Sequence, residues 1–131
     1  MFTIRSGFSG FSVDSSAKAR EFYGETLGLD VTKHGYGTRI HLPGGATVFF
    51  YPKGAGHKPA NYTVLNLVVD DIDEAADELK AKGIRFDTGT YTDEKGIQRG
   101  IKAGMGPDQA WFKDPAGNII SVLKEPDESI V

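Results

Sequence analysis

The chain has 131 residues, of which 39% are hydrophobic and 25% are charged, and a formal net charge of −3 at pH 7. This composition is typical of one soluble domain, and the small negative charge gives no reason to expect nucleic acid or an anionic membrane as a partner. Because there is no cysteine, disulfides, thiolate metal sites and cysteine nucleophiles are excluded. At the start of the chain there is no continuous apolar stretch like that of a signal peptide, and no later segment is long enough to span a membrane, so we expect a cytoplasmic protein.

The first half of the chain predicts a strand, a helix and further strands. In the strand Phe8–Val13, alternation places Phe11 and Val13 toward the helix and leaves Phe8, Gly10 and Ser12 on the other face. The helix follows Asp14 and ends at Gly28, with a buried stripe made of Ala19, Phe22, Tyr23 and Leu27. The segment "RIHLPGGATVFFYPK" (39–53) then predicts strands, and "KGAGHKPANY" (53–62) has the composition of a linker.

The second half begins with the strand Val64–Val69, in which Leu65, Leu67 and Val69 face a helix and Val64, Asn66 and Val68 face away. Asp71 or Asp73 caps that helix, Gly83 ends it, and its apolar face carries Ile72, Ala75, Ala76 and Leu79. Residues 88–106 are glycine-rich and charged, which predicts a long loop. In "WFKDPAGNIISVLKE" (111–125) a structural turn contains Asp114, Pro115 and Gly117.

The two halves repeat one plan. Residues 8–31 match 64–86, and residues 39–53 match 111–125, with Pro43 on Pro115 and Gly45 on Gly117. The second half is longer by about 16 residues, all within 88–106, with boundaries good to a few residues. Each half therefore predicts a strand, a helix and three strands.

The duplicated plan resembles the vicinal oxygen chelate superfamily, through "REFYGETLGLDV" (20–31) after the first strand and "FKDPAGN" (112–118) before the last. That superfamily includes glyoxalase I, extradiol dioxygenases, fosfomycin-resistance enzymes and bleomycin-resistance proteins. The resemblance implies an α+β fold with two βαβββ modules, whose curved mixed sheets enclose a cleft, and it implies a homodimer. We expect a single domain, 1–131, made of modules 1–53 and 63–126, a linker 54–62 and a C-terminal tail 127–131.

In metal-using members of the superfamily the ligands come from the first and last strands of each module. Carried over by position, these slots are Phe8, Phe49, Val64 and Ser121. Divalent metals need imidazole, carboxylate or thiolate donors, which Phe and Val lack, and a neutral serine hydroxyl is a poor ligand. We therefore predict no metal and no cofactor, which disfavours glyoxalase I or dioxygenase activity. For His34, His41 and His57, whose spacing matches no metal motif, we expect surface or hydrogen-bonding roles.

Alternation and the resemblance together predict an apolar face with a few polar groups, the usual form of a small-molecule site. The predicted ligand-binding residues are Phe8, Arg39, Phe49, Tyr51, Val64, Asn66, Trp111 and Ser121. Each has a plainer alternative, because the apolar side chains could fill the core, Asn66 could make an internal hydrogen bond, and Arg39 could form a rim ion pair.

Three functions stay open from the sequence. The first is a metal-independent protein that binds a small aromatic or amphipathic molecule. The second is a metal-free lyase, isomerase or hydrolase, with Tyr51 and His41 as catalytic candidates. The third is an interaction or structural module with a filled cleft. The 88–106 loop is either a lid that delivers Lys95 or Arg99 to an anionic ligand or, as we favour, a solvated hairpin tip.

Overall fold

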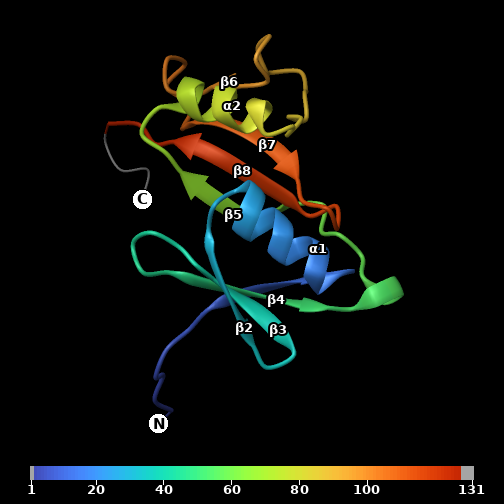
Figure 1. Cartoon of the computed structure of the whole chain (residues 1–131). Helices are drawn as coiled ribbons and strands as arrows, with labels where there is room; N and C mark the ends of the chain where they lie inside the picture. The colour runs from blue at the N-terminus through green and yellow to red at the C-terminus, as the bar shows by residue number, and fades with distance from the viewer. Residues whose placement is uncertain (1, 128–131) are drawn as a thin grey trace. The chain divides into compact units, whose positions relative to one another are not determined.

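The computed structural model describes residues 2–127, and these residues form two compact units that divide between Pro59 and Ala60. We call them unit 1 (2–59) and unit 2 (60–127). Each unit contains one four-stranded mixed sheet with helical segments, as Figure 1 shows. The predicted α+β class and the two βαβββ repeats are confirmed, because both units run strand, helix, strand, strand, strand along the chain.

Unit 1 is built on a sheet with the strand order β1-β4-β3-β2. Its elements are β1 (Ser9–Val13), α1 (Ser16–Arg20), η1 (Glu21–Thr26), β2 (Asp30–His34), β3 (Gly37–His41), β4 (Thr47–Pro52) and the short 3₁₀ turn η2 (Gly54–Gly56). Strand β1 runs parallel to β4, whereas β3 pairs antiparallel with both β4 and β2. A crossover through α1 and η1 is what allows the first and last strands to lie parallel.

The predicted first helix is only partly regular. The Ser15 hydroxyl caps α1 by accepting from the Lys18 backbone N–H, but from Glu21 onward the backbone becomes a π-helix. Its wider i→i+5 bonding, seen between Leu27 N–H and the Phe22 carbonyl, changes which side chains face the sheet. Ala19 and Tyr23 are buried as predicted, whereas Phe22 and Leu27 are only half-buried, so the predicted stripe was half wrong.

The core of unit 1 lies between this helical segment and the sheet. The Tyr23 ring, fully buried, lies 5.9 Å from the Phe11 ring and 5.7 Å from the Phe50 ring. Val13 and Ile40 are fully buried on the same side. This confirms that Phe11 and Val13 face the helix, and it leaves the opposite face of the sheet to the residues of the other parity.

Unit 2 repeats the plan with the strand order β5-β8-β7-β6. Its elements are β5 (Thr63–Val68), α2 (Ile72–Ala81), β6 (Gln98–Arg99), β7 (Asp108–Lys113) and β8 (Ile119–Lys124). The Asp71 carboxylate caps α2 by accepting from the Glu74 backbone N–H, and Gly83 ends the helix region with φ of 90°, both as predicted. Strand β6 has only two residues, and it lies inside the segment predicted as loop.

The turn between β7 and β8 is structural, as predicted. The Asp114 carboxylate is buried and accepts hydrogen bonds from the backbone N–H groups of Ala116 and Asn118, both at 2.9 Å. The Asn118 amide also donates to it at 3.1 Å, and Gly117 has φ of 83°. Asp114 therefore stabilises the turn from inside and is not presented to a ligand.

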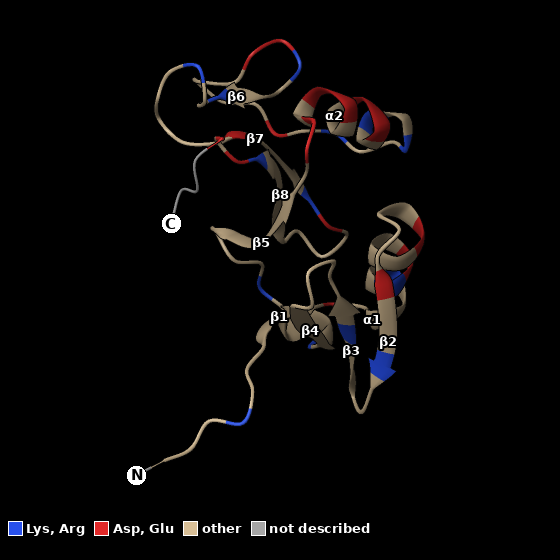
Figure 2. Cartoon of the chain, turned by 90° about the vertical axis from the view of Figure 1, so that its left-hand side faces the viewer, with Lys and Arg blue, Asp and Glu red and all other residues tan. Residues whose placement is uncertain are grey.

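Residues 88–106, which we call the strap, are anchored to α2 rather than free in solvent. Arg99 makes bonds of 2.8–2.9 Å to both carboxylate oxygens of Asp73, and Lys95 reaches Asp73 at 2.9 Å and Asp77 at 3.2 Å. Figure 2 shows the acidic side of α2 and the basic residues of the strap region. Because Ile97 is also fully buried, the solvated-tip prediction was wrong.

Apart from Asp127, the predicted tail 127–131 lies outside the described residues. The assignment of 54–62 as a linker stays a prediction. Within residues 2–127, no helix is both long enough and apolar enough to cross a membrane.

Candidate functional site

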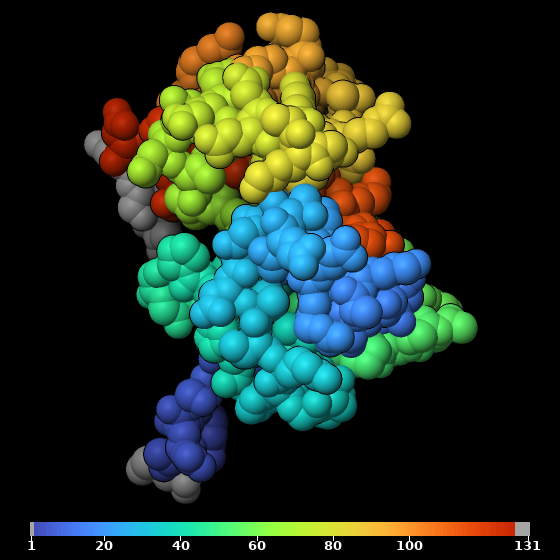
Figure 3. Space-filling view, in the orientation of Figure 1, coloured from blue at the N-terminus to red at the C-terminus, as the bar shows by residue number. Residues whose placement is uncertain are grey.

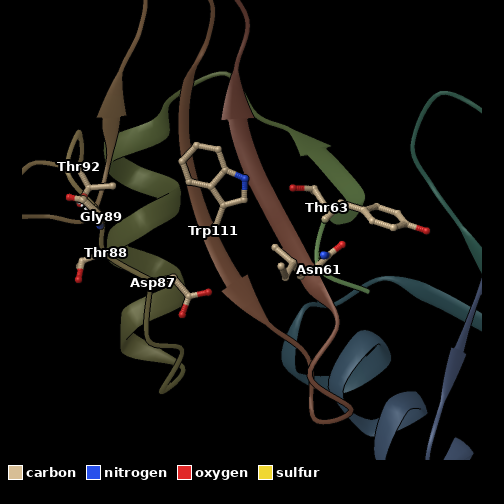
Figure 4. Close-up of a pocket in the computed structure, with 9 residues that line it drawn as sticks. Asn61, Thr63, Asp87, Thr88, Gly89, Thr92 and Trp111 are labelled. Carbon is tan, nitrogen blue, oxygen red and sulfur yellow. Dashed lines mark hydrogen bonds between the residues drawn. The ribbon is translucent and has the colours of Figure 1, made fainter. Parts of the chain in front are cut away.

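A pocket of about 300 Å³ opens beside Trp111 in unit 2 (Figure 4). It lies on the sheet face that α2 leaves open, since Ala110 and Phe112 on either side of Trp111 are buried toward the helix. Its lining combines the indole and Ile119 with hydroxyl, amide and carboxylate groups. The lining residues are Asn61, Tyr62, Thr63, Asp87, Thr88, Gly89, Thr92, Trp111 and Ile119.

Backbone contacts fix the wall of this pocket next to Trp111. The Asp87 N–H donates to the Trp111 carbonyl at 2.7 Å, which attaches residues 87–89 to β7. The Thr92 hydroxyl then closes a small turn by accepting from Gly89 N–H at 2.9 Å and donating to the Gly89 carbonyl at 3.0 Å. On the outside, Lys113 pairs with the Asp87 carboxylate at 3.1 Å. The pocket wall is therefore held in place without any ligand.

A β-bulge in β5 changes which of its residues reaches the pocket. Thr63 pairs with Ile119 and Leu65 with Ile120, so Val64 is an extra residue opposite no partner. Strict alternation predicted that Val64 would face this side and Thr63 would not. The bulge reverses the two at this point, and Thr63 lines the pocket while Val64 does not. Val64 as a ligand-binding residue therefore stays a prediction, and it is not part of the lining of this pocket.

Next to the pocket-lining strands, three polar side chains form a hydrogen-bonded row. Ser121 is fully buried, and its hydroxyl donates to the Asn66 side-chain oxygen and accepts from the Gln109 amide at 3.0 Å. Gln109 also donates to the same Asn66 oxygen at 3.4 Å. Asn66 is exposed, and the internal hydrogen bond given as the alternative to ligand contact is present. Gln109 was missed, although its position two residues before Trp111 gives it the same parity.

The register of β7 and β8 pairs Trp111 with Ser121, so the two side chains lie on one face of the sheet. Of the four residues predicted in unit 2, only Trp111 lines the pocket. Asn66 and Ser121 belong to the polar row on the same strands. Thr63 was not predicted because alternation placed it on the other face. The pocket residues from 61–62 and 87–92 were not predicted because they lie in segments without strand periodicity.

In unit 1, the sheet face opposite the core carries a cluster of rings around Phe49. The Phe49 ring lies 6.0 Å from Phe8, 5.5 Å from Tyr36 and 6.2 Å from Tyr51. The guanidinium of Arg39, which pairs with Phe49 across β3 and β4, lies 5.8 Å from the centre of the Phe8 ring. All four residues predicted in unit 1 therefore come together. Tyr36, which is 76% exposed, was missed because its turn position gives no periodic signal.

The residues at the four metal slots do not fit a metal. Phe8 and Phe49 pack their rings together, Val64 lies in the bulge, and the Ser121 hydroxyl is already bonded on both sides. Among residues 2–127, no three His, Asp or Glu side chains converge in a way that could hold an ion. The donor set that the superfamily uses is therefore missing from these positions.

The histidines and Tyr51 have local partners. His41 is hydrogen-bonded through Nε2 to the Thr32 hydroxyl at 2.9 Å, and His57 through Nδ1 to the Ser12 hydroxyl at 2.7 Å. The His34 ring packs edge-on against Phe49. Hydrogen-bonding or surface roles are thus present for all three. Tyr51, the other catalytic candidate, stacks on Phe49 and lies edge-on to Tyr36.

Comparison with known proteins places the chain in a family. The model of the Glyoxalase/Bleomycin resistance protein/Dioxygenase superfamily matches residues 8–122, so the chain belongs to this superfamily. No curated protein matches the chain.

Solved structures with the same fold cover nearly the whole chain. TnmS3, an antibiotic binding protein from Streptomyces sp. CB03234, is 24% identical, with 95% of this chain and 99% of that one covered and a TM-score of 0.64. A superfamily member from Sphaerobacter thermophilus DSM 20745 is 25% identical, with coverages of 92% and 98% and a TM-score of 0.65. A glyoxalase / bleomycin resistance protein from Catenulispora acidiphila DSM 44928 is 20% identical, with coverages of 92% and 97% and a TM-score of 0.62.

Proposed function

We propose that this protein binds a small aromatic or amphipathic molecule without a metal ion, and that Trp111 is the main contact. The observation that carries the proposal is the pocket of about 300 Å³ beside the indole. This volume is at the lower end of the range for small-molecule sites, which combine apolar walls with a few polar groups. The neighbouring hydroxyl and amide groups would orient a ligand, and the indole face would stack on its ring.

Further observations support the proposal. Phe8, Arg39, Phe49 and Tyr51 give unit 1 a second surface that suits a flat apolar group, with one cation beside it. The four slots without metal donors support binding without a metal. TnmS3, which has the same fold, is an antibiotic binding protein, and this supports a small-molecule ligand here. The pocket beside Trp111 also argues against the third function, an interaction or structural module in which side chains fill the cleft.

The test is a thermal-shift and native mass-spectrometry screen of the full chain against aromatic metabolites and antibiotics, with and without a chelator. A ligand at 100 times its Kd stabilises a protein by about 2.7 kcal/mol, which is an easily measured rise in Tm. For each compound found, we expect no effect of the chelator. We expect Trp111→Ala to weaken binding about tenfold or more, because it removes both the stacking ring and its buried area.

Phe2→Ala is the matched control, since it removes an exposed aromatic side chain from the other unit and should leave binding unchanged. Equal binding by the Trp111→Ala and Phe2→Ala variants would contradict the role of Trp111. Binding that requires an added transition metal would contradict metal independence. Chemical conversion of a bound compound that Tyr51→Phe abolishes would favour the metal-free enzyme instead.

A further inference from the structure

We propose that the strap forms a second binding site, separate from the Trp111 pocket, for an aromatic anion. A hollow of about 550 Å³ lies entirely within strap residues, between Thr90 and Met105. It shares only Thr92 with the lining of the Trp111 pocket. Figure 3 shows the strap as an exposed surface beside α2, in gold and orange. The site belongs to the insertion that makes the second repeat longer than the first.

The hollow is preformed, because two small loops around it are fixed by their own backbone bonds. One loop is closed by the Asp93 N–H bond to the Ile97 carbonyl at 2.9 Å, and the other by the Met105 N–H bond to the Gly100 carbonyl at 2.9 Å. At Gly100 a side chain would come within 2.3 Å of the Pro107 carbonyl oxygen, so the two chain segments touch there. Buried Ile97 forms part of the lining.

The hollow is lined in part by large apolar and aromatic side chains that are exposed to solvent. Tyr91 is 80% exposed and Met105 is 81% exposed, and both line the hollow. Large apolar side chains left open around a concave surface are typical of a ligand site. A tyrosine ring and a thioether both make favourable contacts with an aromatic ring. The rim therefore suits a flat aromatic group.

Three charged residues line the hollow, namely Asp93, Arg99 and Lys102. Arg99 lines it, but all three guanidinium nitrogens are bonded to Asp73 and Asp93, so its charge is compensated. Lys102 also lines the hollow, and it forms no ion pair with any residue in the range 2–127. One cation thus stays available beside an aromatic rim. A carboxylate or sulfonate on the aromatic ring would pair with it.

The sequence provides one reporter for each pocket. Trp111 is the only tryptophan, so one indole N–H signal reports on the first pocket, and Met105 is one of two methionines. We would label the full chain with ¹⁵N and with ¹³C-methyl methionine, assign the methyl signal with Met105→Leu, and titrate with 2-naphthalenesulfonate. We expect a saturable shift of the Met105 methyl signal, with a different dependence on probe concentration from any shift of the Trp111 indole signal.

Two variants and a neutral probe locate the contacts. Lys102→Gln should weaken 2-naphthalenesulfonate binding about threefold to fivefold, the effect of one solvent-exposed ion pair. Tyr91→Ser should weaken it about fivefold by removing the ring contact. Lys82→Gln is the control, because Lys82 is exposed and lines neither pocket. Uncharged 2-naphthol should bind more weakly to the native chain and be unaffected by Lys102→Gln.

The proposal is overturned if the Met105 methyl signal does not move at millimolar probe concentration, or if Lys102→Gln and Lys82→Gln have equal effects. A shift of the Trp111 indole alone would overturn it while supporting the first pocket. A shift of the Met105 methyl signal alone would support the strap site. It would not bear on the Trp111 pocket, which the ligand screen proposed above tests. Because Tyr91 and Lys102 are exposed, their variants should keep the native ¹⁵N spectrum, which checks that the fold is intact.

Discussion

At the scale of single residues, Phe49 organises the aromatic face of unit 1, and Gly37 makes room for it. Phe49 is 8% exposed although it lies on the sheet face opposite the core, because Phe8, His34, Tyr36 and Tyr51 surround its ring. A side chain at Gly37 would lie 2.4 Å from the Phe49 ring and 2.4 Å from the Phe50 carbonyl oxygen. Because the second of these atoms is backbone, a rotamer change of Phe49 cannot relieve the conflict.

We predict that Gly37→Ala lowers the free energy of unfolding by about 2 kcal/mol, the usual cost of overpacking. It should also disturb the ring cluster, which near-ultraviolet circular dichroism would detect. Gly56→Ala is the control, since nothing lies within 4 Å of a side chain there and its effect should stay within about 0.5 kcal/mol. Urea unfolding measures both. If the two variants had the same urea unfolding midpoint, the aromatic face of unit 1 would be able to accommodate the added methyl group, and the prediction would be wrong.

At the scale of elements, ion pairs between α2 and the strap hold the strap in place. Lys95 and Arg99 are both bonded to carboxylates of α2, and Arg99 is also bonded to Asp93 in the strap itself. Delivery of Lys95 or Arg99 to an anionic ligand stays a prediction, and it would require these pairs to break. Hydrogen bonds from Arg99 and then Lys95 hold the pKa of the Asp73 carboxyl well below its usual value of 3.8.

We predict that Asp73→Asn lowers the free energy of unfolding by about 1 kcal/mol near pH 7, the value for a bidentate arginine–carboxylate pair that is partly screened by solvent. Because the folded-state pKa is depressed, this stabilisation is complete above the unfolded-state pKa and is lost as the pH falls through the folded-state pKa. The difference in the free energy of unfolding between the native chain and the Asp73→Asn variant should therefore begin to shrink below about pH 4 and still be measurable at about pH 3.

Glu78→Gln serves as the control for this prediction, because it removes a carboxylate of the same helix that forms no ion pair with another described residue. Its effect should be near zero and nearly independent of pH. Thermal unfolding followed by circular dichroism at several pH values compares the three chains. A pH-independent effect of Asp73→Asn would mean that its charge does not stabilise the strap.

At the scale of the whole molecule, both units expose large apolar side chains. Phe8 is 61% exposed and Tyr36 is 76% exposed in unit 1, while Tyr62 is 67% and Val68 is 60% exposed in unit 2. Groups of such residues favour contact with a partner. The homodimer implied by the superfamily resemblance stays a prediction, and this exposed apolar surface gives it a physical reason.

We predict that sedimentation equilibrium at micromolar concentration gives twice the chain mass of 14.2 kDa. Tyr36→Ser should shift the equilibrium toward the single chain, because it removes exposed aromatic area. Tyr91→Ser, at an equally exposed tyrosine in the strap, should not change it. A single-chain mass for the native protein at all concentrations would contradict the dimer.

Patterns local in sequence were enough to predict most of the fold. The repeated order of strand, helix and turn, the Asp71 cap, the stops at Gly28 and Gly83, and the Asp114 turn all depend on neighbours along the chain. The superfamily resemblance and the repeat, rather than alternation, implied that Arg39 lies beside Phe49 and Trp111 beside Ser121, and the register agrees. These features follow from the periods of strands and helices, which the amino-acid order carries directly.

Other features were decided only by contacts between distant segments. The bulge at Val64, where β5 pairs with β8, shifts the periodicity, so Thr63 replaces Val64 at the pocket. The pocket wall needs the 2.7 Å bond between Asp87 and Trp111, which joins residues 24 positions apart. Arg99 meets Asp73 only because the chain returns over α2. The sequence therefore determined which faces exist and that the metal donors are missing, whereas tertiary structure decided which side chains meet, because a register shift or a returning loop leaves no periodic signal.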